Sequence, residues 1–268
     1  MSNLELVFPE IFLSLSIMFL LIVGVFKKDS SKLVHNISLI ILLITAVITF
    51  NETLSTEQSF LFSNSVIIDY LSSFMKIITL LAAFLVLVIS SSYLKNIKIF
   101  KIEYPILILS SVLGMMIMIS SNDLIVFYMG LELQSLALYV LATFNRDQLK
   151  SSEAGLKYFV LSALSSGLLL YGCSLIYGFT GSTNFNLIAD QLNSNEYALT
   201  FGIVFILVGL SFKISAVPFH MWAPDVYEGS PTSTTLFFTM VPKIAALTVF
   251  IRFLYVPFFN LIDQWQMI

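Results

Sequence analysis

The most informative residues of this sequence are charged side chains that lie inside long apolar stretches. A charge at the centre of a lipid bilayer costs at least ~2.5–3.5 kcal/mol on insertion scales, so such residues normally face a polar interior and serve a function. The charged residues in this setting are Lys76, Glu132, Lys157, Lys213, Lys243 and Arg252. This pattern is typical of a membrane protein that moves charge, and the expected charge is a proton.

Glu132 and Lys213 are the strongest candidates for proton transfer. Glu132 lies about halfway along an apolar helix, where a short carboxylate reaches water poorly. It must be paired with a cation or protonated, because burial disfavours its charged form; the alternative is a protonated Glu132 that only bonds two helices together. Lys213 lies deep in another apolar stretch, just before Pro218. A lysine whose charged form is destabilised by burial can take up and release a proton.

The case for proton transfer is weaker for Lys243 and Lys157. Lys243 follows Pro242 directly, and broken helices are tolerated at membrane depth only where they line a cavity or pack inside protein. We therefore expect Lys243 to lie in a hydrated pocket. Lys157 is one turn into its predicted helix and has Glu153 as its i−4 neighbour. The residues alone support proton transfer and a surface ion pair equally for Lys157.

A histidine lies where the sequence predicts a broken helix. Pro218 and Pro224 flank His220, and we expect them to unwind the end of the seventh helix. Histidine titrates near neutrality and can carry protons, but His220 could equally cap the broken helix. The candidates for a relay or for support of the helix breaks are His220, Pro218, Pro242 and Asp225.

The remaining charged residues favour structural roles. Lys76 and Asp69 lie seven residues apart on one helix face, as a relay or a simple ion pair, and Arg252 is close enough to its helix end to reach the interface. We prefer the structural interpretation for all three. No two ligands stand at metal-binding spacing, and no haem, flavin or nucleotide fingerprint occurs, so we expect no metal or cofactor bound by this chain.

The elements that position these residues must be membrane helices. Of the 268 residues, 58% are hydrophobic and 11% are charged, which leaves too little polar surface for a soluble domain and no basic patch for nucleic acid. Several apolar segments approach the ~20 residues that a spanning helix needs. They are 7–26, 33–50, 66–94, 104–121, 124–144, 154–180, 197–221 and 232–256. We therefore predict an all-α polytopic membrane protein with about eight transmembrane helices.

The loop charges predict the orientation. The first, third and fifth loops hold the basic residues Lys27, Lys28, Lys32, Lys95, Lys98, Lys101, Arg146 and Lys150. The second, fourth and sixth loops hold the acids Glu52, Glu57, Asp123, Asp190 and Glu196. By the positive-inside rule, the N-terminus lies outside, in the periplasm or intermembrane space.

The cellular location is predicted from weaker features. Residues 1–10 lack the basic region of a signal peptide and the arginine-rich character of a transit peptide, which indicates insertion where the protein is made. Frequent Phe, Ile and Asn hint at an AT-rich organelle genome. The expected location is the mitochondrial inner membrane, with a bacterial plasma membrane as the alternative.

One long segment is similar to a known family. The run FKISAVPFHMWAPDVYEGSP, residues 212–231, resembles closely the broken helix of the antiporter-like subunits of respiratory complex I. Segments 131–136 and 153–159 resemble one branch of that family, NADH dehydrogenase subunit 2, called subunit N in bacteria. The resemblance covers most of the chain and is strongest from 104 to 256.

The resemblance implies roles for individual residues. It makes Lys213 the central proton carrier of a half-channel and Glu132 the glutamate that forms an ion pair with it. It places Lys157 and Lys243 on a polar axis within the membrane, which favours proton transfer for Lys157. His220 matches a histidine of the loop after the broken helix.

The resemblance also implies an architecture. Residues 1–103 would form three leading transmembrane helices, 104–256 the first of two inverted five-helix repeats with a broken seventh helix, and 257–268 a C-terminal tail. The second repeat, which carries another essential lysine in the family, is absent from this sequence. We expect this chain to be a fragment, a shortened subunit, or one product of a split gene whose partner polypeptide supplies the second repeat, and we favour the last two.

The expected function is that of a proton-translocating membrane-arm subunit of NADH:ubiquinone oxidoreductase, with no redox chemistry in this chain. Its partners would be other membrane-arm subunits, including neighbouring antiporter-like ones, and membrane lipids. NADH, FMN, iron–sulfur clusters and ubiquinone would belong to partner subunits. The alternatives are a subunit of a multi-subunit cation/proton antiporter, which shares the lysine and glutamate pattern, and a structural subunit that does not pump.

Overall fold

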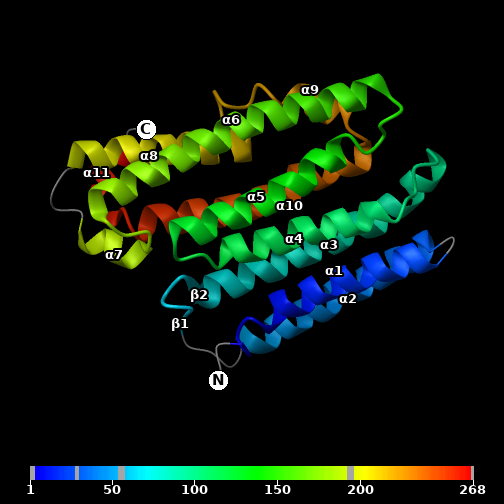
Figure 1. The fold of residues 1–268 in the computed structure, drawn as a ribbon, viewed down its shortest axis with the longest axis horizontal. Helices are drawn as coiled ribbons and strands as arrows, with labels where there is room; N and C mark the ends of the chain where they lie inside the picture. The colour runs from blue at the N-terminus through cyan, green and yellow to red at the C-terminus, as the bar shows by residue number, and fades with distance from the viewer. Residues whose placement is uncertain (1–3, 28–29, 54–57, 192–195, 267–268) are drawn as a thin grey trace.

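Long helices that run roughly side by side make up the protein (Figure 1). The computed structural model describes residues 4–27, 30–53, 58–191 and 196–266. The long helices are α1 Phe8–Phe26, α2 Ser31–Thr53, α3 Tyr70–Asn96, α4 Glu103–Ile119, α5 Leu124–Ala142, α6 Leu149–Thr180, α8 Glu196–Ile214 and α10 Thr232–Tyr255. Among the described residues, six helices are long and apolar enough to cross a membrane, and α4 and 199–214 of α8 are shorter apolar helices. The prediction of an all-α polytopic membrane protein is confirmed.

Short elements connect the long helices or follow the last of them. They are β1 Ser59–Leu61, β2 Val66–Ile68, α7 Phe185–Asp190, α9 Ala223–Gly229, the 3₁₀ helix η2 Phe259–Leu261 and α11 Ile262–Trp265. Lys28 and Glu57, which contribute to the predicted orientation, lie outside the described residues, and so does the side chain of Glu196. Parts of 1–10 and of the tail 257–268 also lie outside them. The orientation itself stays a prediction.

The third predicted helix begins later than the sequence indicated. Residues 66–68 pair as an antiparallel strand with β1, in the register Ser59↔Ile68. Their β-branched side chains favour a strand. Asp69 then caps α3: its carboxylate accepts a hydrogen bond from the Ser72 backbone N–H at 2.8 Å, and its own N–H donates to Ser72 Oγ at 3.0 Å. This capping box fixes the start of α3 at Tyr70.

The hairpin is joined to two other loops at the same end of the bundle. The carbonyl of Asn64 accepts hydrogen bonds from the side-chain amides of Asn122 (2.9 Å) and Asn184 (2.7 Å). The backbone N–H of Ile67 also donates to the carbonyl of Ser120 at 2.8 Å. The α2–α3, α4–α5 and α6–α7 connections are therefore held together at one end of the bundle.

The seventh predicted helix ends earlier than expected. It stops at Ile214, and Ser215 adopts a left-handed backbone conformation with φ 61°. The chain then turns until α9, which has Pro224 in its first turn. Pro218 explains the early end, because the residue before a proline is disfavoured in the α conformation. The predicted broken helix is thus present, but its first half is shorter than 197–221.

Small residues let α4 and α5 approach closely. A Cβ atom added to Gly114 would lie 2.5 Å from the backbone N of Gln134, and one added to Gly130 would lie 2.8 Å from the backbone N of Met118. Close backbone approach through small residues is a common way for helices to associate in membranes. The contact fixes the helix that carries Glu132.

We predict that Gly130→Ala destabilises the protein, because the new methyl group meets backbone rather than a movable side chain. Overpacking of this kind costs about 1–3 kcal/mol. Thermal unfolding of the detergent-solubilised protein measures the effect. Gly178→Ala is the matched control, because nothing lies within 4 Å of a Cβ atom added there. Equal melting of the two variants would contradict the predicted role of the glycine contact.

Candidate proton-transfer site

Lys213 lies at the junction of three helices. It is in the last turn of α8 and is buried. Its ammonium Nζ donates hydrogen bonds to Ser135 Oγ of α5 (3.0 Å) and to Ser162 Oγ of α6 (2.6 Å). Ser162 Oγ also accepts a hydrogen bond from the hydroxyl of Tyr139 at 2.7 Å. The ammonium therefore has neutral hydroxyl groups as its direct partners.

Local sequence explains why these groups converge. Ser135 and Tyr139 are four residues apart on α5 and so share one face of the helix. The early end of α8 places Lys213 in the last turn of that helix, where the negative end of the helix dipole favours a cation. The ring of Tyr139 adds a further contact, with its centroid 6.0 Å from Lys213 Nζ. A cation is thus accommodated without a fixed counter-charge.

Glu132 does not form the direct ion pair with Lys213 that the resemblance implied. No ion pair joins the two side chains in the described part of the chain. Glu132 is half-buried, and its Oε1 atom is buried without a hydrogen-bond partner among the described residues. It lies one turn before Ser135 on α5, close enough to interact with Lys213 electrostatically. On α5 it is therefore Ser135, and not Glu132, that contacts Lys213 directly.

A row of aromatic rings leads from the Lys213 site to Lys243. The neighbouring ring centroids are 5.1, 4.6 and 5.7 Å apart, in the order Tyr139, Tyr158, Trp222 and Tyr227. Lys243 Nζ lies over the last ring, 5.6 Å from its centroid. Trp222 is anchored by a 3.0 Å hydrogen bond from its indole N–H to the carbonyl of Phe212, the residue before Lys213. The two lysines are thus held in one packed unit.

Lys243 does not lie on a broken helix. Pro242 is buried inside α10, which continues from Thr232 to Tyr255. The expected break is absent because one missing N–H donor removes one helical hydrogen bond, and the buried neighbours Val241 and Phe238 hold the helix on both sides of it. Lys243 is half-buried against Tyr227.

Lys157 forms exposed ion pairs. Its Nζ lies 2.8 Å from Glu153 and 2.7 Å from Asp225, and 42% of its side chain is exposed. The helix starts at Leu149, so Lys157 is about two turns into it rather than one. Lys157 thus makes the surface ion pair with Glu153 that was one of its two alternatives, and Asp225 joins it. Lys150 and Glu228 add a further exposed pair at 3.1 Å beside a shallow pocket of about 140 Å³.

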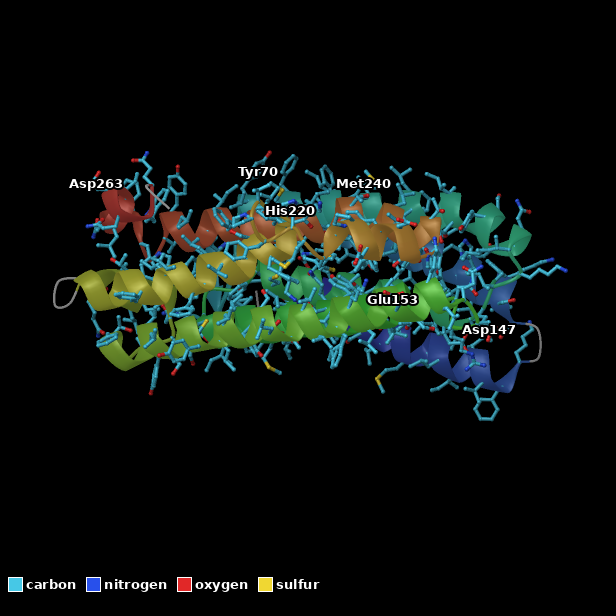
Figure 2. The ribbon with its side chains drawn as sticks, turned by 90° about the horizontal axis from the view of Figure 1, so that it is seen from above. Tyr70, Asp147, Glu153, His220, Met240 and Asp263 are labelled. Carbon is cyan, nitrogen blue, oxygen red and sulfur yellow. The ribbon has the colours of Figure 1, made fainter. Side chains whose placement is uncertain are left out.

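His220 takes no part in these contacts. Its side chain is exposed in the turn that follows α8 (Figure 2). Within the described residues its imidazole makes no hydrogen bond or ion pair, although its carbonyl accepts the N–H of Ala223 at 2.9 Å. Pro218 is exposed in the same turn. The backbone contact is that of a residue at a helix start.

Ser135, Ser162 and the four ring residues were not singled out from the sequence. A serine inside an apolar helix is a weak signal, because its hydroxyl often bonds to the carbonyl one turn earlier. Ser135 does so here, donating to the carbonyl of Leu131 at 2.7 Å. The spacing of Glu132, Ser135 and Tyr139 on one helix was the available clue.

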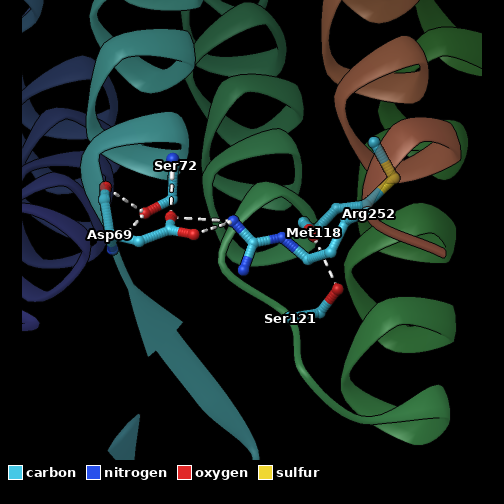
Figure 3. A network of polar contacts seen from close by, with 5 residues as sticks. All are labelled: Asp69, Ser72, Met118, Ser121 and Arg252. Atoms are coloured by element: carbon cyan, nitrogen blue, oxygen red, sulfur yellow. Dashed lines mark hydrogen bonds and ion pairs between the residues drawn. The ribbon is translucent and has the colours of Figure 1, made fainter. Parts of the chain in front are cut away.

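The predicted pairing of Lys76 with Asp69 is wrong. Asp69 instead accepts two hydrogen bonds from Arg252 Nη2 of α10, at 2.8 and 3.0 Å (Figure 3). Lys76 pairs with Glu10 of α1 at 2.5 Å. Asp69 is the cap of α3, so its carboxylate turns back toward Ser72 and away from the helix face that carries Lys76. Arg252, expected to reach the interface, is buried within this pair.

The Asp69 carboxyl lies outside the membrane-spanning helices, at the start of α3. Burial raises its pKa, but the Arg252 guanidinium and the hydrogen bonds of Ser72 outweigh burial and hold the pKa below its usual value. A depressed pKa means that the pair contributes stability above the pKa of the unfolded state. That contribution is lost as the pH falls through the pKa of the folded state.

We predict that Asp69→Asn lowers the free energy of unfolding at neutral pH by up to about 3–5 kcal/mol, because Arg252 keeps a buried charge without its partner. Asparagine still caps a helix, so the substitution isolates the charge. The difference from wild type should shrink below about pH 4, as Asp69 becomes protonated. Thermal unfolding in detergent across pH measures it.

The matched control is Glu228→Gln, which removes an exposed ion pair with both side chains 77% exposed. Its effect should stay within about 1 kcal/mol. A loss for Asp69→Asn that is independent of pH would exclude the ion pair as its cause.

The early-ending helix, the buried lysine at its end and the second lysine on the following long helix together define an antiporter-like membrane protein. The family model for "NADH:quinone oxidoreductase/Mrp antiporter, TM" matches residues 121–268, which is more than half of the chain. The chain belongs to this family. The resemblance found in residues 212–231 is therefore confirmed.

Known proteins agree with this assignment. NADH-quinone oxidoreductase subunit N of Pelagibacter ubique is 73% identical over 266 residues, which cover 99% of this chain and 56% of that protein. A chain of respiratory complex I from Thermus thermophilus with bound aureothin is 29% identical, with a TM-score of 0.79 over 91% of this chain and 52% of that one. A chain of the Mrp complex from Dietzia is 21% identical with a TM-score of 0.80, covering 97% of this chain and 50% of that one, and shows the fold alone. The chain spans about half the length of the proteins it matches.

Proposed function

We propose that this chain forms the proton-carrying first part of a membrane subunit of a NADH:quinone oxidoreductase, with Lys213 as its central proton carrier. The observation that carries the proposal is the buried ammonium of Lys213, held by two serine hydroxyls from different helices. The relative from Pelagibacter ubique, named NADH-quinone oxidoreductase subunit N, supports the choice of complex.

The hydroxyl partners suit a group that gains and loses a proton. A charged lysine donates to Ser135 and Ser162, whereas a neutral amine can accept from one of these hydroxyls, once that hydroxyl rotates, and still donate to the other. Both protonation states are therefore satisfied without movement of the helices. A carboxylate in direct contact would instead stabilise only the charged state. Glu132, one turn away, is placed to change the proton affinity of Lys213 when its own charge changes.

We propose that Lys243 responds to the charge of Lys213 through direct electrostatic interaction, and not through a chain of water molecules. The aromatic row between them fills the space with apolar rings, and charges interact more strongly where water is excluded. Loss of the proton from Lys213 would then change the proton affinity of Lys243. We propose that Lys157 and Asp225 form the exposed end of the same polar axis, with His220 and Pro218 supporting the end of the broken helix and Pro242 supporting α10 beside Lys243.

The proposed setting is the membrane arm of a bacterial complex. Because the relative with 73% identity is bacterial, we propose the plasma membrane in place of the mitochondrial inner membrane that the composition had indicated. Neighbouring membrane-arm subunits and lipids would be the partners, and NADH, FMN, iron–sulfur clusters and ubiquinone would belong to other subunits. The proposal includes the division of the chain into leading helices, 1–103, and a first repeat, 104–256. It also includes a second repeat, which further sequence of the same chain or a separate polypeptide would supply.

A subunit of a cation/proton antiporter is the second candidate. The family description includes Mrp antiporters, and the Dietzia chain has the same fold. The identity to subunit N favours the oxidoreductase. The two candidates differ in one measurement: NADH oxidation coupled to proton transport depends on the chain only in the first.

We predict that Lys213→Ala lowers NADH-driven proton transport in membrane vesicles by about tenfold or more, the scale at which a positioned proton-transfer group contributes. Coupled NADH oxidation should fall with it, while the complex remains assembled on a native gel. Lys101→Ala, which changes an exposed loop lysine, is the matched control. Wild-type rates in an assembled Lys213→Ala complex would exclude Lys213 as the carrier.

We predict that Glu132→Gln also lowers proton transport while leaving assembly intact, because the amide keeps the shape of the side chain but cannot change its charge. The measurement is the initial rate of vesicle acidification at saturating NADH. Glu103→Gln at the exposed start of α4 serves as the control. An unchanged rate for Glu132→Gln would show that Lys213 works without a neighbouring charge.

A further inference from the structure

A polar pocket lies between the start of α2 and the end of α3, at the end of the bundle opposite the β1–β2 hairpin (Figure 1). Its volume is about 180 Å³, several times the ~30 Å³ share of one water molecule in the liquid, so it has room for a larger group. Its polar lining residues are Lys32, His35 and Asn36 of α2 and Ser91 and Lys95 of α3. None of these is an acid.

A buried histidine in this pocket lacks a hydrogen-bond partner. His35 is only 3% exposed, and both of its ring nitrogens, Nδ1 and Nε2, are buried without a partner among the described residues. Its ring packs against Phe100, with the ring centroids 5.5 Å apart. A neutral imidazole carries one N–H donor, and a buried donor that stays unpaired is costly. The donor of His35 is therefore available to a ligand that accepts a hydrogen bond.

Two lysines at the pocket are likewise without a counter-charge. In the described part of the chain, neither Lys32 nor Lys95 forms an ion pair. Lys95 Nζ lies 5.2 Å from the centroid of Phe100, the same ring against which His35 packs. The described residues within 27–32 and 95–103 include five lysines and one acid. Unpaired cations beside an unpaired N–H donor are suited to binding an anion.

Exposed apolar residues continue from the pocket along both helices. One row starts from Asn36 on α2 and the other from Lys95 on α3, and each proceeds at helical spacing along one face. The rows are Ile40, Leu43 and Val47 on α2, and Val88, Leu85 and Leu81 on α3, each 41–60% exposed. Both helices are long and apolar enough to cross a membrane, and they pack against each other. An anion that carries acyl chains would fill the pocket and cover these rows, whereas a free anion would fill the pocket alone.

We propose that Lys32, His35 and Lys95 bind the phosphate group of an anionic phospholipid, whose acyl chains lie along the two apolar rows. Basic pockets between membrane helices are suited to anionic headgroups. The lysines supply positive charge, and the N–H of His35 donates a hydrogen bond to a phosphate oxygen. The loop charges predict this end of the bundle as the inner one. This lipid site is separate from Lys213 and does not depend on the proposed function.

The test is photolabelling of the complete native assembly that contains this chain. The assembly is reconstituted in phosphatidylcholine nanodiscs with a small fraction of phosphatidylglycerol that carries a photoreactive group on an acyl chain. After illumination, mass spectrometry locates and quantifies the label. We expect label within residues 36–47 and 81–95, at several times the yield given by phosphatidylcholine with the same photoreactive group. Equal yields from the two lipids would contradict the proposal.

A pair of lysine variants separates a defined site from general attraction to a basic surface. Lys95→Gln should lower the yield from phosphatidylglycerol about fivefold, the scale at which one lysine contributes to binding of anionic lipid. Lys101→Gln is the matched control, because Lys101 is exposed in the same connection and does not line the pocket. It should change the yield little. Equal losses in the two variants would exclude a defined site.

The histidine is tested separately. His35→Phe keeps an aromatic ring against Phe100 but removes the N–H donor, so the yield should fall while the lysines remain. An unchanged yield would exclude His35 as a ligand of the phosphate. If His35→Phe prevents assembly, the comparison of Lys95→Gln with Lys101→Gln still decides whether the pocket binds the lipid.

Inorganic phosphate distinguishes a lipid from a free anion. Label that is lost on addition of phosphate, but not of sodium chloride at equal ionic strength, would assign the pocket to a free anion and overturn the proposal. Absence of label on α2 and α3 would also overturn it, and is the result expected if an acidic segment of a neighbouring subunit fills the pocket. The labelling needs no NADH, so failure of proton transport to depend on Lys213 would leave this result unaffected.

Discussion

The hydrogen bonds from Lys213 to Ser135 and Ser162 bring three helices to one buried charge, and the geometry of the surrounding bundle follows from the need to satisfy it. The end of α8 brings the ammonium to α5 and α6, and the glycine contact with α4 fixes the helix that carries Ser135. The aromatic row closes the space on the side toward α10. Each feature compensates for a charge placed where the bilayer cannot solvate it.

Two ion pairs elsewhere in the bundle obey the same constraint in a different way. Asp69–Arg252 and Glu10–Lys76 are direct ion pairs, whereas Lys213 has hydroxyl partners and a carboxylate one turn away. A direct ion pair stabilises both of its charges, whereas the hydroxyl partners of Lys213 can satisfy either of its protonation states. The bundle thus combines ion pairs, which hold helices together, with a lysine that can gain and lose a proton.

The sequence was sufficient to locate the helices and the buried charges, because hydrophobic length and the cost of an intramembrane charge are local properties. It was not sufficient to assign partners. Arg252 and Asp69 are 183 residues apart, and their contact depends on how α10 packs against α3. The hairpin at Val66 and the early end of α8 were missed because a run of apolar residues fits a strand, a turn or a helix equally well until neighbours decide. The sequence also predicted a helix break at Pro242, whereas α10 is continuous there. Packing against its neighbours outweighs the tendency of proline to break a helix.

The position of Trp222 has a practical consequence. The chain contains two tryptophans, and Trp222 stacks between Tyr158 and Phe212 in the unit that joins the two lysines. Trp265 lies far along the chain, with its indole bonded to the carbonyl of Phe258. Exchanging Trp265 for phenylalanine would leave Trp222 as the one tryptophan of this chain, in the packed unit that joins the two lysines. Its emission would then give an optical signal from the space between Lys213 and Lys243, with no label attached.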